Sequence, residues 1–343
     1  MSMQNRERKK TTLLCNMIRE IAPEIGAHLL LEPEWNTVGQ ITFKNGIKKY
    51  FRYNTLDINT KGSSEIAADK DYTNFFLKSL GYPTVPGSKA FYSDEWSNTI
   101  GSTNRRIQDA YKHAQKLGFP VIVKPNGGSQ GKNISFVNNK NEFYKSVKTI
   151  FESDRIALVQ KIVSGKDYRI VVLDNKIIAA YQRIPLNIIG DGKSSVSQLF
   201  DVKMNQIAQI GRKNKIDIND ERIQLKLKHQ NINKKYIPKK DEVVTLLCNA
   251  NLSTGGDAID VTDKMHKFFK ETAINITKDM GLRLCGVDIM IDGDISKKTK
   301  KYTVIEINSN PSFLNYYSIG DIQKARIRNM YKEILLKIQN SNC

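Results

Sequence analysis

The sequence has 343 residues, of which 40% are hydrophobic and 8% aromatic, a composition typical of a folded protein with a large core and two or three domains or subdomains. Its 54 lysines and arginines exceed its 35 aspartates and glutamates, which gives a net charge of +19 and favours an acidic partner such as nucleic acid, membrane phosphates or acidic small substrates. The basic residues are scattered without interleaved aromatic side chains, which argues against a dedicated nucleic-acid motif.

Cysteines and apolar runs set two further limits. The four cysteines (Cys15, Cys248, Cys285 and Cys343) form no C-x-x-C pair and share no metal-binding spacing with the four histidines, so free thiols in a reducing compartment are expected. No apolar run approaches the ~18–20 residues that span a bilayer, and the polar, basic N-terminus lacks the apolar core of a signal peptide. These features predict a soluble, cytoplasmic protein.

The first 62 residues are expected to form a small α+β domain. Residues 11–21 have the helical spacing of apolar side chains, with Pro23 as the expected end of the helix. Residues 40–43 and 47–53 have strand-like patterns on either side of an Asn-Gly turn, which is a strong hairpin signal. Nothing in this segment indicates a chemistry.

Residues 63–165 are expected to form an α/β subdomain. One continuous helix is predicted over residues 63–80, from a plausible serine N-cap to a Gly-Tyr-Pro stop. Lys70 lies early in this helix, and its position alone favours a solvated lysine. Later elements are two helices and a strand, over residues 105–117, 141–151 and 156–160.

The central feature of this region is residues 121–134, which read Val-Ile-Val-Lys-Pro-Asn-Gly-Gly-Ser-Gln-Gly-Lys-Asn-Ile. A strand carries Lys124, a loop with three glycines follows, and a second strand resumes. Glycine amides can converge on an anion because they carry no Cβ, and Lys124 and Lys132 add positive charge. The pattern differs from a P-loop, since Gly131 and Lys132 precede Asn133 and a strand rather than a helix. It predicts a lid over a nucleoside triphosphate, with an ordinary hairpin turn as the alternative.

Residues 166–343 are expected to form a larger subdomain. Two strands joined by a tight turn are predicted within residues 168–183, and Arg183 stands near a strand end, where substrate contacts are common. Residues 249–260 form a second glycine-containing loop, rich in amide and hydroxyl donors, which we call the donor loop. A helix is expected to follow over residues 264–280.

Two apolar strands, over residues 285–291 and 302–308, carry acidic and amide side chains. Glu306 and Asn308 project to one face because residues two apart in a strand share a face. If Asp288 faces them from a neighbouring strand, three oxygen ligands converge, which suits Mg²⁺ holding polyphosphate. Because burying such groups without a cation is costly, these strands predict a metal site, with an exposed sheet edge, where these groups cost nothing, as the alternative.

Seven segments, in this order, resemble the ATP-grasp superfamily, and more closely the ATP-grasp regions of cyanophycin synthetases and bifunctional glutathione synthetases: SSEIAADK, VIVKPNGGSQGKNI, GKDYRIVVLDNK, RIPLNIIGDGKSSV, NLSTGGDAIDVTD, GVDIMI and VIEINSNPSF. They cover about residues 63–318. The resemblance implies an α/β (α+β) ATP-grasp fold, with two α/β subdomains clamping ATP beside the small N-terminal α+β domain. Residues 63–165 would bear the lid and residues 166–343 the metal site, after a separate N-terminal domain over 1–62.

Enzymes of this superfamily use ATP and Mg²⁺ to phosphorylate a carboxylate, and an amine then captures the acylphosphate to give an amide. The resemblance therefore implies a carboxylate–amine ligase acting on an amino acid, a peptide or a similar metabolite, with two Mg²⁺ ions. Relatives often form dimers or tetramers. The alternatives are an ATP-grasp kinase that phosphorylates a non-carboxylate acceptor, and a basic nucleic-acid-binding protein with a degenerate nucleotide site.

The resemblance also implies roles for individual residues. Those expected on ATP phosphates or in the lid are Lys70, Lys124, Gly127, Gly128, Ser129, Gln130 and Gly131. Those expected on adenine and ribose are Gln160, Lys161, Val163 and Asp167. The Mg²⁺ ligands would be Asp288, Glu306 and Asn308, and the phosphoryl and acyl site would be lined by Arg169, Arg183 and Asn251.

This chain departs from the pattern of its relatives at two places. Gln160 stands where relatives commonly carry glutamate, although its amide oxygen can still accept a hydrogen bond from adenine. Leu247 and Cys248 precede the donor loop, where relatives often have arginine. The Mur-ligase-like or γ-glutamylcysteine ligase domains of these relatives do not fit within 343 residues, so a stand-alone ligase is expected. Residues 204–242 carry no assigned role.

Overall fold

The computed structural model describes residues 11–128, 131, 133–210, 212 and 216–340. Its helices are α1 (Leu13–Glu24), α2 (Lys61–Ala68), α3 (Lys70–Ser79), α4 (Asp94–Thr99), α5 (Ile107–Leu117), α6 (Lys140–Phe151), α7 (Val196–Gln209), α8 (Glu221–His229), the 3₁₀ helix η1 (Leu252–Thr254), α9 (Lys267–Asp279), α10 (Leu314–Tyr317) and α11 (Asp321–Gln339). Its strands are β1 (His28–Leu31), β2 (Val38–Thr42), β3 (Lys48–Arg52), β4 (Thr55–Leu56), β5 (Lys89–Tyr92), β6 (Val121–Pro125), β7 (Ser135–Val137), β8 (Ile156–Lys161), β9 (Lys166–Leu173), β10 (Lys176–Ile184), β11 (Asn187–Ile189), β12 (Val243–Thr245), β13 (Asp257–Asp260), β14 (Leu284–Ile291) and β15 (Tyr302–Asn308).

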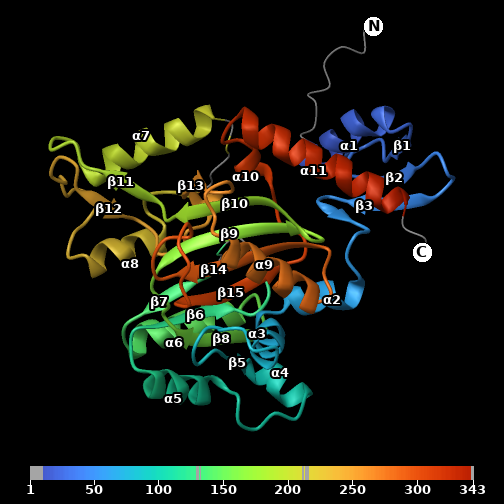
Figure 1. Ribbon diagram of the computed structural model, residues 1–343. Coiled ribbons are helices and arrows are strands. Elements are labelled where there is room, and N and C mark those ends of the chain that lie inside the picture. Colours follow the sequence, from blue (N-terminus) through green and yellow to red (C-terminus); the bar gives the residue numbers. More distant parts are fainter. Residues whose placement is uncertain (1–10, 129–130, 132, 211, 213–215, 341–343) are drawn as a thin grey trace, which may run out of the picture.

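A five-stranded antiparallel sheet in the order β13-β10-β9-β14-β15 forms the centre of the molecule (Figure 1). Strand β9 is apolar on both faces. Val171 and Leu173 pack into a core shared with α1 and α11, whereas Ile170 and Val172 pack into a core shared with α9. Since successive strand residues point to opposite faces, the near-continuous apolar run of β9 is explained by helices covering both sides of the sheet.

A second sheet, β5-β8-β6-β7, lies below the central sheet in Figure 1 and is covered by α5 and α6. Val121 and Val123 of β6 are buried in the core beneath these helices. Lys124 follows Val123 and therefore projects from the opposite face of the strand, away from that core. The alternation within β6 thus places a lysine at the boundary between the two sheets.

A third unit is formed by residues 186–247, which contain β11, α7, α8 and β12, and we call it the inserted unit. Its own core includes Leu186, Phe200, Ile223 and Leu247. Sequence reasoning assigned no role to the basic segment over 204–242. The apolar residues that build this core are separated by long polar stretches, which concealed the unit in the sequence.

The N-terminal segment forms the antiparallel meander β1-β2-β3-β4 next to α1. Helix α1 includes Pro23 and extends to Glu24, one residue beyond the end that was predicted at that proline. Leu14 and Ile18 of α1 share one core with Ile334 of α11. The segment is therefore packed against the C-terminal helix, and the domain boundaries at residues 62 and 165 stay a prediction. No helix within the described residues has the length and apolarity to cross a membrane.

The helix predicted over residues 63–80 is broken in two, which corrects the sequence-based expectation. Asp69 is extended (φ −98°, ψ 112°), ending α2 and capping α3 by accepting a hydrogen bond from the Tyr72 N–H. An aspartate can favour a cap over a helix interior because its carboxylate satisfies free N–H groups. The donor loop also differs from expectation, since its last four residues form the edge strand β13.

Candidate functional site

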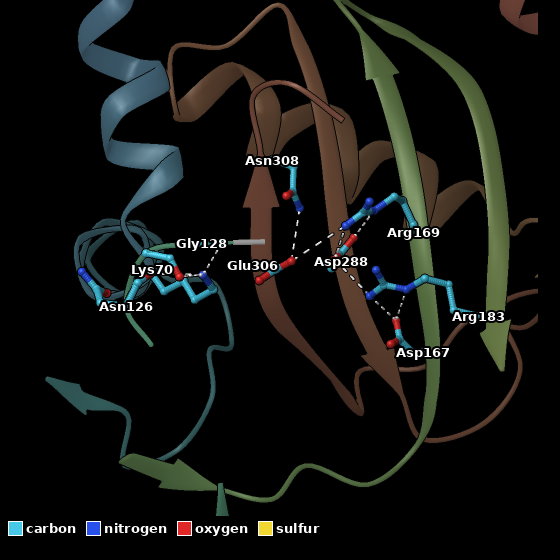
Figure 2. A network of polar contacts seen from close by, with 10 residues as sticks. Lys70, Asn126, Gly128, Asp167, Arg169, Arg183, Asp288, Glu306 and Asn308 are labelled. Carbon is cyan, nitrogen blue, oxygen red and sulfur yellow. Dashed lines mark hydrogen bonds and ion pairs between the residues drawn. The ribbon is translucent and has the colours of Figure 1, made fainter. Parts of the chain in front are cut away.

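Five charged side chains gather on one face of the central sheet because of its strand register (Figure 2). Asp288 of β14 lies opposite Arg169 of β9 on one side and Glu306 of β15 on the other. Arg183 of β10 lies opposite Asp167 of β9. Each strand therefore places its charged residue beside a residue of opposite charge, or beside a second carboxylate.

Asp288 is the centre of this network and is fully buried. Its two carboxylate oxygens accept hydrogen bonds from Arg169 Nε and Nη2, both at 2.6 Å. Arg183 Nη2 lies 3.0 Å from the same carboxylate and donates to Asp167 Oδ1 at 2.7 Å. Two guanidinium groups are thus held by the buried Asp288 and the half-buried Asp167, which fixes their orientation in a region of low dielectric constant.

Glu306 is held more loosely than Asp288. Its Oε1 lies 3.8 Å from Arg169 Nη2 and accepts a hydrogen bond of 3.4 Å from Asn308. Burial alone would raise the pKa of Glu306, but the nearby cations, led by Lys70 and Lys124, lower it to about 2. Its Oε2 has no hydrogen-bond partner among the residues that the structure describes. Glu306 therefore presents an ionised, available oxygen at neutral pH.

The residues predicted to bind Mg²⁺ have suitable chemistry and placement. Asp288 and Glu306 are direct cross-strand neighbours, and Asn308 extends from the same strand as Glu306. Carboxylate and amide oxygens are the ligands that Mg²⁺ prefers, and Asp288 Oδ1, which accepts only from Arg169 Nε among the described residues, keeps a lone pair beyond that contact. Within the described part of the chain no three His, Cys, Asp or Glu side chains gather, and a metal site here would need the amide oxygen of Asn308 beside the two carboxylates.

Lys124 and Lys70 face the network from the lid side. Burial lowers the pKa of Lys124 to about 8, while Glu306 and Asp288 oppose this shift. Lys70 donates from Nζ to the carbonyl oxygens of Asn126, Gly127 and Gly128, at 3.1, 3.2 and 3.1 Å. The interpretation of Lys70 as a solvated lysine was therefore wrong, because its ammonium group organises the glycine loop.

Sequence reasoning missed the polar contacts that hold the start of this loop. Asn126 donates to Asp69 Oδ2 at 2.7 Å and accepts from the Asp71 N–H at 3.0 Å. The Gly127 N–H donates to Asp154 Oδ2 at 3.1 Å. The N-cap signal of Asp69 was present in the sequence, but its second partner, Asn126, lies in the loop after β6, far away in the sequence. Two further predicted lid residues, Ser129 and Gln130, lie outside the described residues.

Gly131 brings the lid loop against the donor loop. Its φ is +67°, and a Cβ there would lie 2.1 Å from Asn249 Nδ2 and 2.3 Å from Asn251 Nδ2. Arg212 binds the backbone of the donor loop, because its Nη2 donates hydrogen bonds to the carbonyl oxygens of Leu252 and Gly256 at 2.5 and 2.7 Å. Arg212 was not predicted, because only the tertiary fold brings it to this loop.

The predicted hinge residues lie at the end of β8 and in the segment that connects β8 to β9. Gln160 is buried in β8, whereas Lys161 is exposed and Val163 half-buried. The Lys161 N–H donates to the carbonyl of Pro86 at 3.1 Å. Asp167, expected on ribose, is bound by Arg183, so its carboxylate is part of the charged network. The adenine and ribose roles of these residues stay predictions.

Comparison with known proteins places this geometry in a family. The family model described as D-ala D-ala ligase C-terminus matches residues 76–191, and the RimK-like ATP-grasp domain matches residues 241–329. The glutathione biosynthesis bifunctional protein of Mannheimia succiniciproducens is 37% identical over 209 residues, which are 57% of this chain and 27% of that protein. Cyanophycin synthetase of a Synechocystis species is 32% identical over 259 residues, which are 73% of this chain and 28% of that protein.

The solved structure of the bifunctional glutathione synthetase from Pasteurella multocida matches with a TM-score of 0.58 and 26% identity, over 95% of this chain and 45% of that one. This chain thus spans roughly a quarter to a third of the length of the curated relatives described above (27% and 28%). The mixed α/β ATP-grasp fold that was expected from the sequence is confirmed, and the structure adds that its sheets are antiparallel. The chain has the ATP-grasp fold, and its sequence is similar to the ATP-grasp regions of bifunctional glutathione synthetases and cyanophycin synthetase.

Proposed function

We propose that this protein is an ATP- and Mg²⁺-dependent carboxylate–amine ligase, which forms an amide or peptide bond on an amino acid, a peptide or a similar metabolite. The proposal rests on one observation: four charged side chains form a single ion-pair network beside the glycine loop and its lysines. They are Arg169, Arg183, Asp288 and Glu306. The same combination of oxygen ligands, fixed cations and a lid suits phosphoryl transfer to a carboxylate. We further propose that it acts in the cytoplasm.

In the proposed reaction, a carboxylate oxygen of the substrate attacks the γ-phosphorus of ATP, and ADP leaves. The amine then attacks the acyl carbon, and inorganic phosphate leaves as the amide forms. Arg169 and Arg183 are held by the carboxylates of Asp288 and Asp167, so they can stabilise charge on the transferred group without reorganising. Closure of the glycine loop would exclude water, which would otherwise hydrolyse the acylphosphate.

We assign the nucleotide phosphates to Lys70, Lys124 and the amides of the glycine loop. Mg²⁺, with two ions expected, would neutralise and align the polyphosphate, held by Asp288, Glu306 and Asn308. The remaining assignments follow the resemblance: adenine at Gln160, Lys161 and Val163, ribose at Asp167, and the acyl site beside Asn251. The bond between Asp167 and Arg183 requires that ribose share this carboxylate with the guanidinium.

The test is incubation of the purified protein with Mg²⁺-ATP and pooled amino acids and dipeptides, followed by phosphate release and product mass. Glu306→Gln removes a metal-ligand charge, and Glu271→Gln, an exposed position on α9, is the matched control. Acid-dependent ADP formation with a dehydrative mass gain, lost only in Glu306→Gln, supports ligation. A product that retains phosphate would instead identify a kinase, and turnover that is equal in both variants would contradict the site.

The net charge of +19 supports a finer proposal, namely that the substrate is acidic, such as a glutamate- or aspartate-rich peptide. Acidic substrates should then turn over faster than their neutral amides, and added salt should narrow the difference. Equal rates for acidic and neutral substrates at every salt concentration would contradict it.

A further inference from the structure

A small cavity lies between the inserted unit and the second sheet, β5-β8-β6-β7, whose strands β6 and β7 flank the lid loop. It is separate from the charged network described above. It has a volume of about 40 Å³, more than the roughly 10–15 Å³ that a cavity needs to hold one water. Strand β7 and the residues before it, helix α8 and residues 247–249 form its walls. The cavity is therefore large enough for a small polar group such as a carboxylate.

The wall contributed by α8 is basic. Arg222, Lys226 and His229 all line the cavity, since residues three and four apart share one face of a helix. Asp220 neutralises Arg222 through contacts of 2.9 and 2.8 Å, and Glu142 lies 3.4 Å from His229. Lys226 has no carboxylate within ion-pair distance among the described residues. The cavity thus has one uncompensated positive charge.

The other walls increase the electrostatic field of that charge and add an uncharged hydrogen-bond donor. Ile134, Phe136, Leu225 and Leu247 form apolar surfaces, and low-dielectric walls increase the field at a charge. Asn249 also lines the cavity, and its buried Nδ2 has no hydrogen-bond partner in the part of the chain that the structure describes. A buried amide donor without a partner is costly, and an anion in the cavity would relieve this cost.

The cavity is joined to the lid at Gly131. Arg222 Nη1 donates to the Gly131 carbonyl at 3.4 Å, and the Asn249 amide lies against the Cα of the same glycine. Helix α8 also contacts the lid subdomain through Asn138, whose Nδ2 lies 2.7 Å from His229 Nε2. An anion bound here would therefore lie beside the lid loop and beside the donor loop, which carries Asn251.

We propose that this cavity binds a carboxylate group of the acidic substrate, one that does not react, with Lys226 and the Asn249 amide as its principal partners. The inference rests on the proposed ligase function and adds a determinant of substrate specificity to it. It also explains how a substrate could be held although Leu247 and Cys248, at the place where relatives often have arginine, supply no charge. Lys226 would act by binding, not by taking part in phosphoryl transfer.

Cys248 provides a reporter that needs no turnover, because its thiol lines the cavity while Cys15 and Cys285 are buried. Iodoacetate and iodoacetamide alkylate a thiolate by the same displacement of iodide, but only iodoacetate carries a carboxylate. The measurement is the ratio of their rate constants at Cys248, read by peptide mass spectrometry on the full chain at low ionic strength and divided by the same ratio for free cysteine. This ratio cancels any change in the thiolate fraction.

We expect a normalised ratio on the order of ten for the unchanged protein, as for a steered anion. Lys226→Gln should bring the ratio near one, Lys226→Arg should preserve it, and Lys228→Gln, an exposed position on α8, should leave it unchanged. L-Glutamate should protect Cys248 from iodoacetate better than L-glutamine does.

A ratio near one in the unchanged protein, or an equal ratio in Lys226→Gln, would overturn the proposal. Protection by ATP without protection by glutamate would also overturn it, since the anion would then be a nucleotide phosphate. Because the alkylation needs no catalysis, a failure of the cavity proposal is distinguishable from an absence of ligase activity.

Discussion

Replacement of Asp288 by asparagine should cost more stability than any other single loss of charge in the network. The carboxylate is fully buried and receives three N–H contacts, of 2.6, 2.6 and 3.0 Å, from Arg169 and Arg183. These arginine side chains are only 14% and 8% exposed, so water screens them little. Removing one partner of a buried ion pair typically costs about 3–5 kcal/mol, and we expect Asp288→Asn to lower the free energy of unfolding by that amount.

The assay is urea unfolding in a metal chelator, followed by far-ultraviolet circular dichroism, so that loss of a bound ion does not contribute. Asp292→Asn is the matched control, because Asp292 is 70% exposed and lies 4.0 Å from Lys301. An exposed pair of this kind should contribute within about 0.5 kcal/mol. A loss below about 1 kcal/mol for Asp288→Asn, or equal losses for the two variants, would refute the view that Asp288 neutralises both arginines.

Two further predictions concern the lid. The pKa of Lys124 is lowered to about 8, so its ammonium group is lost as pH rises through that value. Affinity for Mg²⁺-ATP, measured by calorimetry, should therefore weaken above about pH 8, and Lys124→Arg should remove this dependence because arginine stays charged; a flat profile in the unchanged protein would contradict the role. Gly131→Ala places a Cβ 2.1 Å from the Asn249 amide, whereas Gly128→Ala enters open space at a similar positive φ. Both should lower the thermal midpoint, but only Gly131→Ala should also weaken ATP binding several-fold, and equal ATP affinities would argue against contact between the two loops.

The chemistry of the central sheet could be predicted because it depends on short-range rules. Glu306 and Asn308 share a face since they are two residues apart, and the structure pairs Asp288 directly with Glu306. The lysine and glycines of the lid segment were identified from backbone freedom and charge. In each case the informative residues lie within one strand or one loop.

Other features depend on contacts between residues far apart in the sequence. In the sequence alone, Lys70 resembles a solvated lysine. In the structure, the helix breaks at Asp69 and three carbonyl oxygens of the lid loop accept hydrogen bonds from the Lys70 ammonium group. The cap at Asp69 competed with a helical apolar pattern, and its bond to Asn126 was not visible in the local sequence. Arg212 and the basic face of α8 lie in a polar stretch, and only the packing of the inserted unit shows what they face.

The measurement that tests the proposed function most directly follows an oxygen atom. The carboxylate substrate found in the pooled incubation would be labelled with oxygen-18 in both carboxylate oxygens, and the released phosphate analysed by mass after turnover with Mg²⁺-ATP and the amine. If the reaction passes through an acylphosphate, each phosphate carries one labelled oxygen from the substrate, and the amide keeps the other. Unlabelled phosphate, formed at the same rate as the product, would contradict the proposed mechanism.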